Sequence, residues 1–287
     1  MSKPIYVFIH IPKSAGTTFH SILERNYAYQ QQFSFRAPRE LALMRLLAMP
    51  ESRRNKLDCI KGHCGWGIHK HLSRPVNYCT FLRDPVKRVI SEYNYVKRHS
   101  KPYAHQIVKE KNLSLAQFVK GDLTTDNLQL RYLTFMRLED APPGRAQKEW
   151  LEPAKKRLAE DFANFGIVEY FDKSLLLFQH QLNLKKIYYA SKNQSKPTVK
   201  SLTPEPHGWC GESECVSLIQ DRDALDIELY LFARAIFEER WRDFHKNNPM
   251  ALKDFQEFNR KRQSLTALTD HFQFVASRLT WKLQGNW

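Results

Sequence analysis

The stretch "HIPKSAGTTF" (His10–Phe19) directly follows the apolar run Ile5–Ile9, and residues 5–11 are a strand candidate. Residues 17–27 after it carry apolar side chains at helical spacing. A loop of small residues between a strand and a helix presents backbone N–H groups to an anion, with the helix dipole behind them. The stretch therefore predicts an anion site. The plainer alternative is a tight turn capped by Thr17.

The lysine of this loop stands on the unusual side of the glycine. A nucleoside-triphosphate loop has the pattern GxxxxGK[ST], in which the lysine follows the second glycine. Here Lys13 precedes Gly16, and the first glycine of the pattern is missing. The standard ATPase loop is thereby excluded, and the identity of the anion stays open.

The order of the remaining apolar runs predicts an α/β fold. Further strands are expected over 58–63, 76–83, 164–170 and 185–191. Helices are expected over 37–50, 85–98, 114–120, 124–133, 147–162, 173–182 and 221–244, with a polar loop over 192–214. Strands that alternate with helices are typical of a mostly parallel sheet, in which ligands collect at the carboxyl ends of the strands. The loops after the first three strands should therefore meet at one edge.

The length of 287 residues permits one or two domains. We expect an α/β domain over 1–249 and a helical extension over 250–287. An apolar stripe marks that extension: Phe258, Leu265, Leu268, Phe272, Val275 and Leu279. It would pack on the domain or on a second subunit of a homodimer, and peripheral contact with a membrane surface is the alternative.

The charge balance is strongly basic. Lysine and arginine number 45 against 30 acidic residues, which gives a net charge of +15. Such a surplus attracts polyanions, namely nucleic acid, anionic lipid, sulfated glycans and phosphorylated cofactors. Neither an RNA-recognition nor a zinc-finger pattern accompanies the charge, so nucleic acid is the less favoured partner.

The start of the chain does not have the pattern of a signal peptide, because His10, Pro12 and Lys13 interrupt its short apolar run. A continuous apolar stretch of about 18 residues, as a membrane span requires, is also missing, and a cytoplasmic protein is expected. The odd number of cysteines, 5, favours reduced structural thiols. Cys210 and Cys215 would form a bridge only in an oxidising compartment.

A second motif, "FLRDPVKRVISEY" (81–93), begins at the end of another predicted strand. Asp84 and Pro85 have the form of an N-cap and a first-turn proline. Ser91 lies nearly two helical turns beyond Asp84, off the apolar stripe of the helix. Arg83 and Ser91 would suit a second phosphate. In the alternative, Arg83 pairs with Asp84 and Ser91 is solvated.

Together the two motifs resemble the 5′-phosphosulfate loop and the 3′-phosphate motif of sulfotransferases that use 3′-phosphoadenosine 5′-phosphosulfate (PAPS). They are similar to the carbohydrate branch, which includes the heparan sulfate 2-O- and 6-O-sulfotransferases. Supporting patterns lie at 126–133, 189–197 and 225–241, so the resemblance covers about residues 5–245. It implies a P-loop-like three-layer fold, with helices on both sides of a central, mostly parallel sheet.

The resemblance also implies the binding residues. The loop would hold the 5′-phosphate through Lys13, Ser14, Ala15, Gly16, Thr17 and Thr18. Arg83 and Ser91 would hold the 3′-phosphate, with Arg88 as a further candidate. A basic segment with Asn193, Ser195 and Lys196 would cover the cofactor.

Sulfuryl transfer needs a base for the attacking hydroxyl and a cation near the leaving phosphate oxygen. Lys13 suits the second role, and this mechanism requires no metal. Two histidines match the base of the family: His63 matches the Gly-His of the 2-O-like members, and His69 the Gly-Leu-His of the 6-O-like members. We favour His63, because it directly follows the strand over 58–63. His71 is expected to be structural, and His10 to lie in the core or beside the site.

The expected acceptor is a hydroxyl of a carbohydrate, and the basic charge would suit an anionic glycan. Candidates for the acceptor cleft are Trp66, Tyr93, Tyr95, Asn127, Arg131 and Tyr132, with packing as the favoured role of the tyrosines. Two other functions stay open. A nucleotide or small-molecule kinase would need an atypical loop, and a non-catalytic glycan-binding protein would not need the lysine and histidines.

Overall fold

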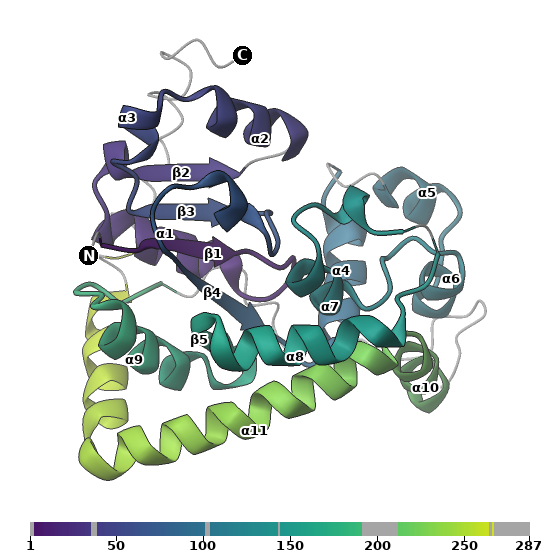
Figure 1. The fold of residues 1–287 in the computed structure, drawn as a ribbon. Coiled ribbons are helices and arrows are strands. Elements are labelled where there is room, and N and C mark those ends of the chain that lie inside the picture. The colour runs from purple at the N-terminus through teal and green to yellow at the C-terminus, as the bar shows by residue number, and fades with distance from the viewer. Residues whose placement is uncertain are drawn as a thin grey trace.

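A five-stranded sheet forms the centre of the molecule (Figure 1). The structure is a computed structural model, and it describes residues 3–35, 39–100, 104–142, 144–190, 212–263 and 266. The strands are β1 (Ile5–Ile9), β2 (Gln32–Phe35), β3 (Cys59–Gly62), β4 (Val76–Leu82) and β5 (Phe162–Ile167). Their order is β2-β3-β1-β4-β5, and every pairing is parallel. The predicted α/β class is confirmed.

The register brings the ends of β1 and β3 to one level, and β4 extends two residues farther in the same direction. Ile9 of β1 stands opposite Gly62 of β3 and Thr80 of β4. The backbone N–H of His10 donates to the carbonyl of Gly62 over 2.8 Å, and the Thr80 hydroxyl donates to the carbonyl of Ile9 over 2.9 Å. The loops after these strands therefore leave the same edge of the sheet, as the sequence predicts.

Helices cover both faces of the sheet. They are α1 (Gly16–Asn26), α2 (Arg39–Ala48), α3 (Glu51–Arg54), α4 (Pro85–Arg98), α5 (Ala104–Glu110), α6 (Leu115–Lys120), α7 (Leu128–Thr134), α8 (Leu151–Glu160), α9 (Phe171–Leu182), α10 (Glu212–Arg222) and α11 (Ala224–Asn247). Residues 251–263 are also helical. The long α11 runs beside α8 (Figure 1).

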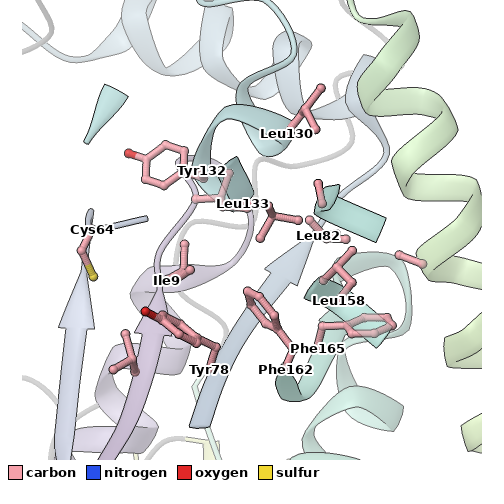
Figure 2. Packing of buried hydrophobic residues seen from close by; sticks show 14 of the residues in the cluster. Ile9, Cys64, Tyr78, Leu82, Leu130, Tyr132, Leu133, Leu158, Phe162 and Phe165 are labelled. Atoms are coloured by element: carbon pink, nitrogen blue, oxygen red, sulfur yellow. The ribbon is translucent and has the colours of Figure 1, made fainter. Parts of the chain in front are cut away.

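Successive side chains of β1 pack into two separate apolar clusters, one on each face of the sheet. Val7 and Ile9 join the apolar cluster that contains α7, α8 and α11, and Phe8 joins the cluster with α1 and α9 on the opposite face. Figure 2 shows part of the first cluster, in which Tyr78 and Leu82 of β4 lie with side chains of α7, α8 and β5. Because both faces of the sheet are covered, the central strand β1 is continuously apolar.

Three segments differ from the sequence prediction. The strand β2 was not predicted, because Gln32–Phe35 is a short edge strand whose first three side chains are partly exposed. Residues 185–190 form no strand; the Tyr189 N–H donates instead to the Asn259 side chain over 2.7 Å. Most of the predicted loop over 192–214 lies outside the described residues, and its last three residues begin α10.

The first part of the expected extension packs on the domain. Phe255 is buried in the cluster of α1 and α9, and Gln256 donates to Asp172 of α9 over 3.0 Å. Most of the predicted apolar stripe lies beyond the described residues. Among those described, no helix combines the length and the apolar character needed to cross a lipid bilayer.

The cysteines divide into two groups. Cys59, Cys64 and Cys79 are buried free thiols, as expected. Cys215 is disulfide-bonded, so the expectation of a reduced thiol is wrong for this residue. Cys210, its expected partner, lies outside the described residues.

Gly62 permits the close approach of β2 to the end of β3. Its φ is +132°, and an added Cβ would lie 2.2 Å from the carbonyl oxygen of Phe35. We expect Gly62→Ala to lower the free energy of unfolding by at least about 2 kcal/mol, because a backbone atom cannot move aside as a side chain can. Chemical denaturation measures this.

Gly144→Ala is the matched control. Gly144 also has a positive φ, +93°, but an added Cβ would meet nothing within 4 Å. Its expected loss is the backbone strain alone, about 1–2 kcal/mol. Equal losses in the two variants would contradict the role of the Phe35 contact.

Candidate functional site

The loop between β1 and α1 has a strained backbone. Lys13 and Ala15 both lie in the left-handed region, with φ of 66° and 56°. Such a conformation costs on the order of 1–3 kcal/mol for a residue with a side chain and is concentrated at functional sites. Ala15 is the N-cap of α1 and makes no side-chain capping bond. The alternative of a turn capped by Thr17 is therefore wrong, and the first N–H groups of α1 point toward the loop without a capping side chain.

Ser14 carries a buried polar atom that the protein does not satisfy. The residue is 1% exposed, and its Oγ has no hydrogen-bond partner among the described residues. A buried hydroxyl left in this way costs about 1–3 kcal/mol. An anion held by the N–H groups of the loop would give it a partner. The loop therefore fits the phosphate group that the sequence predicts.

Arg83 reaches this loop from the end of β4. Its Nη1 donates to the carbonyl of Lys13 over 2.9 Å, and its Nε is buried without a partner in the described part of the chain. Asp84 serves another purpose, since its carboxylate accepts from the N–H of Lys87 and caps α4. The alternative in which Arg83 pairs with Asp84 is therefore wrong, and two guanidinium nitrogens, Nε and Nη2, remain for a ligand.

Gln129 of α7 fixes the backbone of Arg83. Its side-chain oxygen accepts from the Arg83 N–H over 2.9 Å, and its side-chain nitrogen donates to the Arg83 carbonyl over 2.8 Å. Asp226 of α11 in turn accepts from the backbone N–H groups of Gln129 and Leu130. Burial, and then the nearby Asp223, raise the pKa of Asp226 to about 7. The start of α11 therefore positions the arginine at the sheet edge.

Lys13 lies among charged groups on the face of α4. Burial, and then the charge of Arg83, lower its pKa to about 8, while Glu92 acts in the opposite direction. Its ammonium lies 4.1 Å from the centre of the Tyr95 ring. Tyr95 is one helical turn beyond Ser91, so Ser91 belongs to the α4 face that is turned toward Lys13. The structure thus brings Lys13 and Arg83 together and places Ser91 one helical turn before Tyr95 on α4.

Arg88 of α4 is fully buried, and its Nη1 donates to Glu92 over 2.8 Å. Its Nε and Nη2 are buried without a hydrogen-bond partner among the described residues. A role of Arg88 in binding a phosphate stays a prediction. The predicted covering residues Asn193, Ser195 and Lys196 lie outside the described residues.

The two candidate bases have opposite hydrogen-bond roles. His63 follows β3, and its Nδ1 lies 2.8 Å from the carbonyl oxygen of His10. A carbonyl oxygen only accepts, so His63 Nδ1 carries the proton and Nε2 carries the lone pair. This is the tautomer in which Nε2 accepts a proton.

His69 instead contacts the side chain of Tyr78, a residue of β4. The Tyr78 hydroxyl oxygen accepts from the backbone N–H groups of Gly67 and His69, and it lies 2.8 Å from His69 Nδ1. Two N–H donors occupy the lone pairs of the hydroxyl, so its own hydrogen points to Nδ1. The neutral His69 ring then carries its proton on Nε2, which is the wrong tautomer for a base there.

The comparisons with known proteins agree with this geometry. The model of the sulfotransferase family matches residues 4–202. The chain belongs to the sulfotransferase family. The prediction of a PAPS-dependent sulfotransferase is thereby confirmed.

Among curated sulfotransferases, the zebrafish (Danio rerio) heparan-sulfate 6-O-sulfotransferase 1-B is 24% identical over 85% of this chain and 68% of its own length. The human heparan-sulfate 6-O-sulfotransferase 2 is 26% identical over 90% of this chain and 48% of its own length. The chain thus spans about half to two thirds of these relatives. A crystal structure of mouse sulfotransferase SULT7A1 complexed with PAP aligns with a TM-score of 0.36 and 11% identity, over 79% of this chain and 67% of that one.

Most of the predicted acceptor residues in this sulfotransferase have structural roles. Tyr93 donates to the carbonyl of Leu113, Arg131 pairs with Asp126, and Trp66 packs against Tyr78. Asn127 and Tyr132 are buried as well. The preference for packing is right for Tyr93 and Tyr132, and Tyr95 is the candidate that lies at the site. Across the described ranges, no group of three or more metal-ligating side chains is assembled.

Lys13 should titrate close to pH 8. The ammonium is charged below that pH and loses its proton as the pH rises through it, because burial and Arg83 both disfavour the cation. Arg83→Ala removes one neighbouring charge and should raise the pKa of Lys13. NMR of the lysine side-chain carbons measures the titration, with Arg137→Ala as a remote control. An unchanged Lys13 pKa in Arg83→Ala would contradict the proximity of the two cations.

Proposed function

We propose that this chain transfers the sulfuryl group of PAPS to a hydroxyl of an anionic carbohydrate. The observation that carries the proposal is the meeting of the strained loop Lys13–Thr18 with Arg83 at one sheet edge. Both contribute a buried polar atom that lacks a partner among the described residues, Ser14 Oγ and Arg83 Nε. A nucleotide with phosphates at two positions is the ligand that would satisfy both.

The loop is proposed to hold the 5′-phosphosulfate end of PAPS. Its N–H groups at the start of α1 and the Ser14, Thr17 and Thr18 hydroxyls are donors suited to a tetrahedral anion. Arg83 and Ser91 are proposed to hold the 3′-phosphate, since both lie beside the loop and neither belongs to it. PAPS, when bound, supplies an activated sulfuryl group.

His63 is proposed as the general base. With its proton on Nδ1, the Nε2 lone pair takes the proton of the acceptor hydroxyl while that hydroxyl attacks sulfur. Lys13 is proposed to stabilise the negative charge that grows on the leaving phosphate oxygen. An anion in the loop would raise the pKa of Lys13 above the value of about 8 in the free protein, which keeps the ammonium charged during turnover.

The carbohydrate acceptor is supported by the relatives and by the charge. The curated relatives are named heparan-sulfate 6-O-sulfotransferases. The net charge of +15 favours a polyanionic acceptor over a neutral one. A kinase is less favoured, because the loop lacks the GK[ST] sequence.

Three properties stay predictions: a homodimer, contact with a membrane surface, and a cytoplasmic location. The disulfide of Cys215 favours an oxidising compartment over the cytoplasm.

A thermal-shift screen separates the candidate functions. Adenosine 3′,5′-bisphosphate (PAP) should raise the melting temperature without Mg²⁺ if the proposal is right. Selective stabilisation by ATP with Mg²⁺ would overturn it in favour of a kinase. Stabilisation by heparin alone would overturn it in favour of a glycan-binding protein without catalysis.

Replacing the base should remove turnover and leave cofactor binding. We expect His63→Ala to lower kcat at least about 100-fold, the usual scale for a general base, with PAP affinity almost unchanged. His69→Ala is the matched control and should keep near-normal turnover. The reverse pattern would assign the base to His69.

Replacing Arg83 should weaken cofactor binding, whereas replacing His63 should leave it almost unchanged. Arg83→Ala should weaken PAP binding measured by calorimetry by about 10-fold or more, since a charge-assisted hydrogen bond contributes about 1.5–3 kcal/mol. Adenosine 5′-phosphate lacks the 3′-phosphate, so its affinity should change less. Equal losses for the two nucleotides would contradict the assignment of Arg83 to the 3′-phosphate.

A further inference from the structure

His10 lies between the anion loop and the proposed base. Its backbone N–H donates to Gly62 at the end of β3, and its carbonyl oxygen is 2.8 Å from His63 Nδ1. Its ring is stacked on the His63 ring, with centroids 4.4 Å apart and planes 23° apart. His63 is therefore held by both the backbone and the side chain of the same residue.

The other side of the His10 ring contacts the beginning of α1. The ring centroid is 4.9 Å from that of His20. A Cβ added to Gly16 would lie 1.9 Å from Cδ2 and 2.0 Å from Nε2 of His10. The His10 ring thus fills the space that a side chain at position 16 would occupy, and α1 supports it from below.

We propose that His10 is a positioning residue for the proposed base, and that Gly16 is a glycine because the His10 ring needs its space. The proposal rests on the assignment of His63 as base. The ring restricts the rotation of the His63 imidazole, and the carbonyl of His10 fixes its tautomer, so that Nε2 faces the reacting hydroxyl. A misplacement of a reacting group by about 1 Å can lower the rate about 100-fold.

The charge state of His10 fits this role. The titratable groups that face its ring are His63, His20 and Lys13, and the apolar ring of Phe8 is stacked on it as well. Burial, and then the charges of His63 and Lys13, hold the pKa of His10 well below its ordinary value. A neutral ring stacks on His63 both before and after His63 takes a proton, whereas a second cation would repel it.

Two substitutions separate the flat ring from its mere volume. His10→Leu removes the planar surface, and His10→Phe keeps it without a titratable group. We expect His10→Leu to lower kcat by about 10- to 100-fold, with PAP affinity within about twofold of the wild type, and His10→Phe to retain most of the turnover. Normal turnover in folded His10→Leu would overturn the proposal, as would equal losses in both variants.

A double-mutant cycle shows whether His10 acts through His63. In the His63→Ala background, His10→Leu should have no further effect on kcat, because the residue that it positions is gone. An additive loss in the double variant would overturn the proposal, since His10 would then act on another step.

A measurement that does not depend on turnover tests the positioning role of His10 separately from the proposed sulfotransferase function. Long-range ¹H–¹⁵N NMR of the wild-type histidines should give His63 as the Nδ1–H tautomer and His10 as neutral at pH 7. His10→Leu keeps the backbone carbonyl, so a mixture of tautomers should appear in the His63 signal only because the His63 ring, no longer stacked on an imidazole, rotates away from that carbonyl. A mixture already present in the wild type would overturn the positioning role. Failure of PAP to bind, with these signals as expected, would overturn the sulfotransferase assignment of the site alone.

Discussion

The hydrogen bond from Arg83 to the carbonyl of Lys13 joins the two halves of the site. It links the end of β4 to the loop after β1, and it depends on the parallel register in which β4 extends two residues beyond the last pair of β1, Ile9 with Thr80. Without it, two anion-binding groups would lie on neighbouring loops with no fixed separation. With it, the two groups have a fixed separation, as the proposed binding of one ligand with phosphates at two positions requires.

Residues of α7 and α11 hold the backbone of Arg83 in the position that this bond requires. Gln129 binds the backbone of Arg83 on both sides, and Asp226 binds the backbone of Gln129. On the opposite side of the loop, the ring of His10 lies between Gly16 and His63. Arg83 and the proposed base His63 are therefore both held by neighbouring residues, which is how a preorganised site keeps its geometry.

Much of this could be predicted from the sequence. The strand, loop and helix around Lys13 are local features, and the order of apolar runs was enough for a parallel sheet and for the meeting of its loops. The edge strand β2 could not be found, because Gln32–Phe35 lacks a fully buried pattern. The roles of Gln129, Asp226 and His10 depend on contacts between segments far apart in the chain. Their motifs marked them as part of a family pattern, but no spacing reveals their partners.

Transfer of radiolabelled sulfate from PAPS to desulfated heparin tests the central claim most directly. The account predicts label in the glycan and stoichiometric release of PAP, with both lost in His63→Ala. Label that stays on PAPS with every glycan offered, in protein that binds PAP, would contradict it.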